Sequence, residues 1–361
     1  MKYMRITQRT ISRNYKRQLN TVMTKRASTM EKGQSGLAFN RLSDNVAAGV
    51  RAMKVQEERL TSERQLNTIE NFREEFKTID TNLDSIDSIL VSARDKVEKA
   101  LNGTNGGDPR EVIAKEIGSL KKQILQFANS QYAGKFLFGG TNNAEAPFTD
   151  DGTGKLCFNG IPVEDIRYDE ARQTYYYVAP GTKPPNDTYD DRAGIVPGSE
   201  NIYVDIGLGL KVNDNSSIDP RSAFQTNFNG LLVLGFGPSV TGANGTESPN
   251  SAYDIMSELE KVLADPDFDQ DKAGDLFDHF ETVIDDMRFS RVDLGTRMNF
   301  LDRSADRMEN DIVNLTTTET NLISADPFDT AIDLKQCEYT WMAVLQLGTM
   351  LLPTSLLDFL S

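Results

Sequence analysis

The sequence predicts a mainly α-helical protein with a β insert. Its N- and C-terminal arms form a long antiparallel helical coiled-coil bundle, and a small β domain lies between them. Two observations predict this fold. In both arms, apolar residues recur at alternating steps of three and four positions, which is the pattern of a coiled-coil seam. Between the arms, the chain is rich in Gly, Pro, Asn and Asp and carries short aromatic and β-branched runs.

The first arm carries an uninterrupted seam. The stripe runs from Ile69 to Ala100 without a missed step, and Asn102 and Gly103 end it. We assign Ile79, Leu83, Ile86 and Leu90 to this seam. A helix of this length needs a partner helix, because helical propensity alone contributes little stability.

The C-terminal arm carries the longest stripe. It predicts a helix over residues 273–323, in which Arg291 and Glu319 are the polar interruptions. We assign Leu294, Met298, Leu301 and Met308 to its seam. A shorter helix is predicted over residues 253–264. Since the long helix would span about 75 Å, it requires partner helices, which the first arm supplies.

The middle of the chain reads as β structure. Before it, a second helix of the first arm begins near Asp108 and Pro109, a favourable pair for a helix start, and Gly134 marks its end. Asn159 and Gly160 together are a hairpin signal. Strands are predicted at 155–158, 174–178 and 202–206, an exposed loop at 182–198 and a turn at 213–217.

The two ends of the chain have opposite charge and apolar stripes of their own. The first 30 residues hold eight bases and no acid, whereas the last 36 hold five acids and one base, so we expect the ends to attract. The stripes place these residues in subunit assembly: Ile11, Tyr15, Leu19 and Val22 at one end, and Leu334, Trp341, Val344, Leu345, Leu351 and Leu356 at the other. Their apolar surface exceeds what two helices can hide. We therefore expect neighbouring subunits to cover the rest and to order ends that are disordered in the free monomer.

Composition excludes several classes of function. The net charge of −15 argues against nucleic acid as a partner. No apolar run is long enough to cross a membrane and no Sec-type signal peptide is present, so no membrane insertion is expected and the cytoplasm is indicated. A single histidine and two distant cysteines give no catalytic, metal-binding or cofactor-binding set. We predict that the chain is not an enzyme and binds no cofactor.

Short motifs in the first arm resemble a known family. Residues 35–37 and 40–49, which include the motif Ser43, Asp44 and Asn45, resemble the N-terminal signature of the flagellin superfamily. The last segment, residues 343–360, resembles that family's C-terminal helix. Within the superfamily, the segment 134–141 followed by residues 146–148 is similar to the hook–filament junction family, hook-associated protein 3. The motif residues of that segment are Phe138, Gly139 and Gly140.

The resemblance implies an architecture of three parts. These are terminal core segments 1–45 with 325–361, a coiled-coil domain 46–140 with 252–324, and a β-rich outer domain 141–251. The chain departs from the junction family in one place, where Val46 stands instead of a frequent proline. Ser43 or Asp44 must then cap the following helix.

The resemblance also implies a function. The chain would be a structural adaptor subunit of the bacterial flagellum that joins the hook to the flagellin filament. It would be exported by the flagellar type III system without a cleaved signal peptide, so the resemblance replaces the cytoplasm with an extracellular site. Implied partners are further copies of itself in a ring or tube, flagellin, the other hook-associated junction protein, and an export chaperone at the C-terminal helix. The alternatives are flagellin itself, an enzyme on a coiled-coil stalk, and a coiled-coil membrane translocator.

Overall fold

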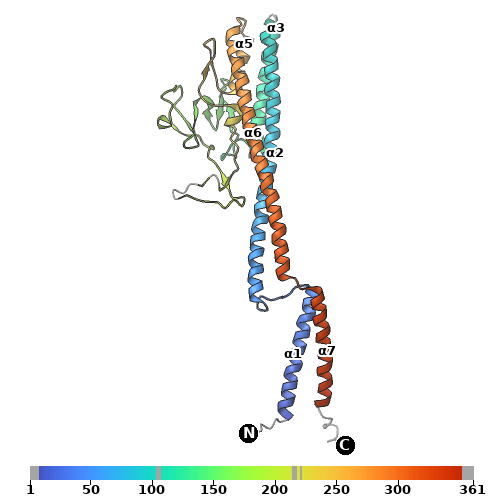
Figure 1. Ribbon diagram of the computed structural model, residues 1–361. Coiled ribbons are helices and arrows are strands. Elements are labelled where there is room, and N and C mark those ends of the chain that lie inside the picture. Colours follow the sequence, from blue (N-terminus) through green and yellow to red (C-terminus); the bar gives the residue numbers. More distant parts are fainter. Residues whose placement is uncertain (1–7, 103–106, 214–217, 220–221, 352–361) are drawn as a thin grey trace. The chain divides into compact units, whose positions relative to one another are not determined.

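The computed structural model describes residues 8–102, 107–213, 218–219 and 222–351 (Figure 1). The chain divides into two compact units, Met1–Glu63 with Glu309–Ser361, and Arg64–Met308. Helices α2 (Val46–Asn102) and α6 (Gln270–Ile323) contribute residues to both units.

In the first unit, the two terminal helices pack side by side (Figure 1). These are α1 (Gln8–Ser35) and α7 (Pro327–Leu351). The Thr29 hydroxyl lies 3.9 Å from the Cys337 thiol, and the Arg26 guanidinium lies over the Trp341 ring at 5.9 Å. Since residue numbers rise along α1 as they fall along α7, the pair is antiparallel. The disorder of these segments in the free monomer stays a prediction.

The start of α2 is capped differently from our expectation. The Asn45 side-chain oxygen accepts a hydrogen bond from the Ala48 amide at 3.1 Å, which is the geometry of an N-cap. Asp44 instead accepts from the Arg41 amide within the preceding turn, and the Ser43 hydroxyl lies 3.5 Å from Asp44. The prediction that Ser43 or Asp44 caps the helix was wrong, because the helix begins at Val46 and the cap is the residue before it.

The polar interruptions of the C-terminal stripe are ion pairs with α2. In the second unit, Arg291 binds Asp80 and Asp84, each at 2.8 Å. In the first unit, Glu319 binds Arg59 at 2.8 Å. Within the second unit, Arg73 also binds Asp302 at 3.6 Å, so α6 runs antiparallel to α2 there. All the predicted seam residues lie in or against one hydrophobic core, fully buried at Ile79, Leu83, Ile86, Leu90, Leu294, Leu301 and Met308 and partly buried at Met298.

The second unit also contains a helical pair that holds the β insert. Helix α3 (Gly107–Ala128) packs against α5 (Ala252–Ala264) (Figure 1). Strands β1 (Gln131–Tyr132) and β2 (Lys135–Phe136) follow α3 as a hairpin. Gly134 was expected to end the helix, but α3 ends at Ala128. With φ of +79°, Gly134 serves the hairpin turn, where a positive φ favours glycine.

The insert consists of short antiparallel sheets. One sheet has the order β3 (Phe148–Asp150), β4 (Leu156–Phe158), β5 (Ile161–Pro162), and another β6 (Ile166–Asp169), β7 (Thr174–Tyr177), β8 (Gly194–Ile195). Two further ribbons pair β9 (Tyr203–Val204) with β10 (Phe224–Gln225), and β11 (Val240–Thr241) with β12 (Glu247–Ser248). Short helices η1 (Val163–Asp165), η2 (Tyr189–Asp191) and α4 (Leu231–Leu234) connect them.

The three predicted strands correspond to β4, β7 and β9, and the sequence did not locate the other described strands. The hairpin at Asn159 and Gly160 joins β4 to β5, as predicted. The expected loop 182–198 is only partly a loop, because β8 within it pairs with β7. Its aliphatic residues are too few to show strand periodicity. Residues 214–217 of the predicted turn lie outside the described residues.

Candidate assembly surface

Helix α7 has an inner apolar stripe that faces α1. Leu334, Cys337, Trp341 and Val344 recur in steps of three and four, and each is buried or half-buried. Gly348 continues the stripe, and a Cβ there would overlap the Tyr15 hydroxyl of α1. The absence of a side chain at this position therefore lets the two helices approach closely.

Helix α7 also has a second apolar stripe on its opposite face. Its large residues, which we call the outer seam of α7, are Phe328, Ile332, Tyr339, Met342 and Met350, with exposed fractions between 54 and 81%. Lys335 and Gln346 occupy the same stripe. Leu345 and Leu347 beside it are also exposed. A helix that is apolar on two opposite faces is normally buried on both, yet α1 covers the inner face of α7 and the outer seam stays exposed.

The predicted assembly residues divide between the two faces. Tyr15, Leu19 and Val22 on α1 and Leu334, Trp341 and Val344 on α7 are half-buried. Ile11 and Leu345 are exposed. The side chain of Leu351 and the whole of Leu356 lie outside the described residues. Their role in assembly stays a prediction.

Sequence reasoning missed most of the outer seam. Phe328, Ile332, Tyr339 and Met350 were not assigned to assembly, although they obey the same steps of three and four as the inner stripe. A search for a second stripe would have found them. Nothing in the sequence alone says which of the two stripes α1 covers.

The expected attraction between the basic and acidic ends of the chain stays a prediction. Among the residues that the structure describes, no salt bridge joins these two helices, and their charged side chains lie mostly on exposed faces. On the outer seam, Lys335 binds Glu338 at 3.0 Å, one turn along the same helix. The hydrogen bond that Lys335 donates to this carboxylate, together with the negative charge of Glu338, raises the pKa of Lys335, which therefore stays protonated at neutral pH.

The glycines of the junction motif allow close backbone approach. Gly140 has a φ of +63°, and a Cβ there would overlap the Gly198 carbonyl. A Cβ on Gly139 would overlap the Asn142 carbonyl, while the neighbouring Phe138 is fully buried. These positions have a packing reason for their residue types.

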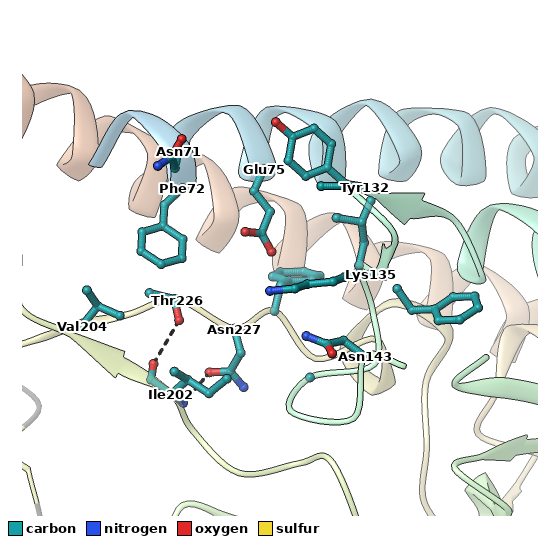
Figure 2. Close-up of a pocket in the computed structure, with 15 residues that line it drawn as sticks. Asn71, Phe72, Glu75, Tyr132, Lys135, Asn143, Ile202, Val204, Thr226 and Asn227 are labelled. Carbon is teal, nitrogen blue, oxygen red and sulfur yellow. Dashed lines mark hydrogen bonds between the residues drawn. The ribbon is translucent and has the colours of Figure 1, made fainter. Parts of the chain in front are cut away.

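The second unit contains a cavity of about 460 Å³, lined by α2, the β1–β2 hairpin and the β9–β10 ribbon. Figure 2 shows the Glu75 carboxylate directed into it, on the side where Lys135 also lies. Burial raises the pKa of Glu75, and the positive charge of Lys135 opposes this change. The other polar side chains at the cavity include Asn71, Asn143 and Asn227, which offer hydrogen bonds but no nucleophile.

The enzyme hypothesis required strongly perturbed titratable groups in one pocket of the insert. Burial raises the pKa of Asp254 to about 7, but this carboxylate accepts a hydrogen bond from the Leu156 amide at 2.7 Å and does not line the cavity. Burial also raises the pKa of Tyr175, which packs against Phe236. Packing accounts for both shifts. Within the described ranges, no group of three or more His, Cys, Asp or Glu side chains is placed to hold a metal ion.

None of the helices that the structure describes is both long enough and apolar enough to cross a membrane.

Comparison with known proteins identifies the helical arm. Residues 6–143 match the family model of the bacterial flagellin N-terminal helical region. No curated protein matches the sequence.

Solved structures of flagellar proteins align with this chain. A Vibrio parahaemolyticus protein assigned as flagellar hook-associated aligns with a TM-score of 0.53 and 18% identity, over 78% of this chain and 100% of that one. FlgL of Bacillus cereus aligns with a TM-score of 0.47 and 15% identity, over 74% and 98% of the two chains. Hook-associated protein 3 of Legionella pneumophila aligns with a TM-score of 0.48 and 13% identity, over 75% and 98%.

The similarity to the Vibrio protein confirms the predicted fold, mainly α-helical with a β insert. The family match covers the segments 35–37 and 40–49 on which the resemblance was based. Within residues 6–143, the chain is therefore similar to the N-terminal helical region of bacterial flagellin.

Proposed function

We propose that this chain is a structural adaptor subunit of the bacterial flagellum, which joins the hook to the flagellin filament. The observation that carries the proposal is the outer seam of α7, a stripe of large apolar side chains that are 54 to 81% exposed. Burying such a side chain contributes about 1.5–3 kcal/mol, so several in a row favour a neighbouring subunit strongly. The fold of the Vibrio hook-associated protein supports the proposal.

The proposal includes a route and a set of partners. The chain is exported by the flagellar type III system without a cleaved signal peptide and acts outside the cell. Its partners are further copies of itself in a ring or tube, flagellin and the other hook-associated junction protein. Before export, a chaperone covers the apolar C-terminal helix, because the outer seam would otherwise drive aggregation. The chain performs no catalysis.

The alternative is flagellin, the filament subunit itself. The two hypotheses differ in the segment 134–148, where the Gly139 and Gly140 backbone packs closely against residues 142 and 198. That arrangement matches the junction motif and favours the adaptor.

Deletion of the gene in its motile host tests the proposal. Bare hooks under the electron microscope, with flagellin released into the medium, are the expected result. Loss of filaments without flagellin in the medium would make this chain the filament subunit. Normal filaments would overturn the proposal.

Complementation of the deletion tests the outer seam. Ile332→Asp places a charge in the stripe and is expected to leave hooks bare, while the protein is still exported. The matched control is Thr340→Asp, which adds the same charge at an exposed position of α7 outside both stripes. Equal motility of the two variants would contradict a role for the outer seam.

A further inference from the structure

A second exposed apolar stripe lies in the same unit, at the start of α2. Val46, Val50 and Met53 are each more than half exposed, although they follow one another in steps of four and three. Glu57 and Leu60 continue the heptad pattern and are also exposed. We call these five residues the α2 seam. The opposite side of this segment, with Ala52 buried and Arg59 paired to Glu319, faces the rest of the unit.

Each of the two exposed seams contains one charged position. In the α2 seam it is Glu57, and no cation of the described residues lies within 4.0 Å of its carboxylate. In the outer seam of α7 it is Lys335. Lys335 already binds Glu338 of its own helix at 3.0 Å. Covering either seam would remove its charge from water, which is costly unless a charge of opposite sign faces it. Two seams with single, opposite charges therefore complement each other.

The spacing around these charges selects one orientation. In an antiparallel pair of helices, residues at equal distances before and after a matched position face each other. When Glu57 faces Lys335, Met53 faces Tyr339 and Val50 faces Met342, each at the same step from the charged pair. In the same register, Leu60 faces Ile332 and Val46 faces Gln346. Every apolar residue of the α2 seam then meets a seam position of α7.

The parallel orientation fails on the same residues. Glu57 follows Met53 by four positions, whereas Lys335 follows Ile332 by three, so the two charges occupy different heptad positions. Parallel coiled coils place like heptad positions in one layer. Each charge would then lie alone among apolar side chains, without its partner.

The contact cannot form within one chain. The Arg59–Glu319 pair shows that the α2 seam lies beside the last turns of α6, and α7 begins only four residues after α6 ends. Turning back across so short a connection would bring α7 to α2 in the parallel direction. In addition, α7 is already paired with α1 of its own chain.

We propose that the outer seam of α7 binds the α2 seam of a second copy of this chain, antiparallel and with Lys335 opposite Glu57. This inference rests on the proposed function, since it names the occupant of the same surface. The contact joins two different patches and is therefore heterologous. Heterologous contacts link subunits head to tail into rings or open helical arrays, as a tube-shaped junction requires.

Cysteine cross-linking between two full-length variants tests the register. One variant carries Val50→Cys and the other Met342→Cys; the natural Cys157 and Cys337 are buried. On mild oxidation of the mixture, we expect a disulfide-linked dimer. The matched control replaces Met342→Cys with Phe328→Cys, which lies about four turns from Met342 and does not face Val50 in the antiparallel register. A yield from the control equal to or above that of the test pair would overturn the proposal.

Charge reversal tests the pairing itself. Lys335→Glu should lower the cross-linking yield about fivefold at low salt, because an exposed ion pair contributes up to about 1 kcal/mol. Glu57→Lys in the partner variant should restore it, and high salt should remove the difference. Failure of the second reversal to restore the yield would refute the pairing.

These results separate the contact from the function. If Ile332→Asp leaves hooks bare but no α2–α7 cross-link forms, the adaptor role stands and the α2 seam is not the partner. If the gene deletion leaves normal filaments, the adaptor role fails whatever the cross-links show.

Discussion

Asp254 provides a quantitative test of the packing in the second unit. It lies in the first turn of α5, where its carboxylate accepts a hydrogen bond from the Leu156 amide at 2.7 Å. Burial raises the pKa of Asp254 from 3.8 to about 7, although the Leu156 amide and the positive charge of Lys155 oppose the change. The difference between these two values corresponds to about 4 kcal/mol of free energy.

The sign of the pH dependence follows from the direction of this change. Below about pH 4, Asp254 is protonated in both the folded and the unfolded chain, and it costs no stability. As the pH rises toward 7, the unfolded chain releases this proton while the folded chain still holds it, so stability falls. Above about pH 7, both forms are ionised and the full cost remains.

Asp254→Asn should remove most of this cost. The amide oxygen of the new side chain can still accept the hydrogen bond from Leu156. The amide nitrogen adds a donor, which would lower the stability of the variant by about 1–3 kcal/mol if it had no acceptor. We therefore expect the variant to be more stable than the natural protein by about 1–3 kcal/mol at pH 8 and equal or less stable at pH 4. Asp254→Ala, which leaves the Leu156 amide without an acceptor, is the control.

Hydrogen exchange of protected amides in α5 and β4, measured in the full chain between pH 4 and pH 8, gives the free energy of opening of this region. Equal slopes against pH for the natural protein and Asp254→Asn would refute the reasoning, because the carboxyl group would then not be the source of the pH dependence.

Two further predictions concern the helical core and the terminal pair. Leu83→Asp or Leu301→Asp should destabilise the core by several kcal/mol, because each places a charge at a fully buried position; an unchanged melting temperature would contradict the seam. Limited proteolysis of the dilute monomer should remove roughly the first 40 and last 35 residues and leave a helical core, as expected for ends that assembly orders. Uniform protection of both ends would contradict that account.

The apolar seams of α2 and α6 could be predicted from the sequence, but the ion pairs between these helices could not. The steps of three and four placed α6 and the end of α2 closely, because burial on a helix face imposes that period on the chain. The stripe of α2 began only at Ile69, although the helix starts at Val46. The interruptions at Arg291 and Glu319 were visible as polar residues in an apolar stripe. Their partners, Asp80 with Asp84 and Arg59, lie more than 200 positions away, and no local pattern connects them.

Local sequence signals gave the wrong assignment where one residue type is compatible with two different structures. Gly134 fits a helix end as well as a hairpin turn, and only the pairing of β1 with β2 distinguishes them. The cap of α2 was assigned to Ser43 or Asp44 rather than Asn45, because several capping residues stand in a row. The packing of the preceding turn decides where α2 starts, and the residue types alone do not determine that packing.

The sequence by itself determined the helical arms, the β insert and the apolar character of the C-terminal helix, because each depends on periodicity within a short segment. Only the tertiary structure decided which face of α7 meets α1 and which face stays open. Both faces carry apolar residues at the same steps of three and four, so no rule that uses only the local sequence can distinguish them. The close approach at Gly348 and the contact of Trp341 with Arg26 choose between them, because burial depends on which surfaces the whole chain brings together.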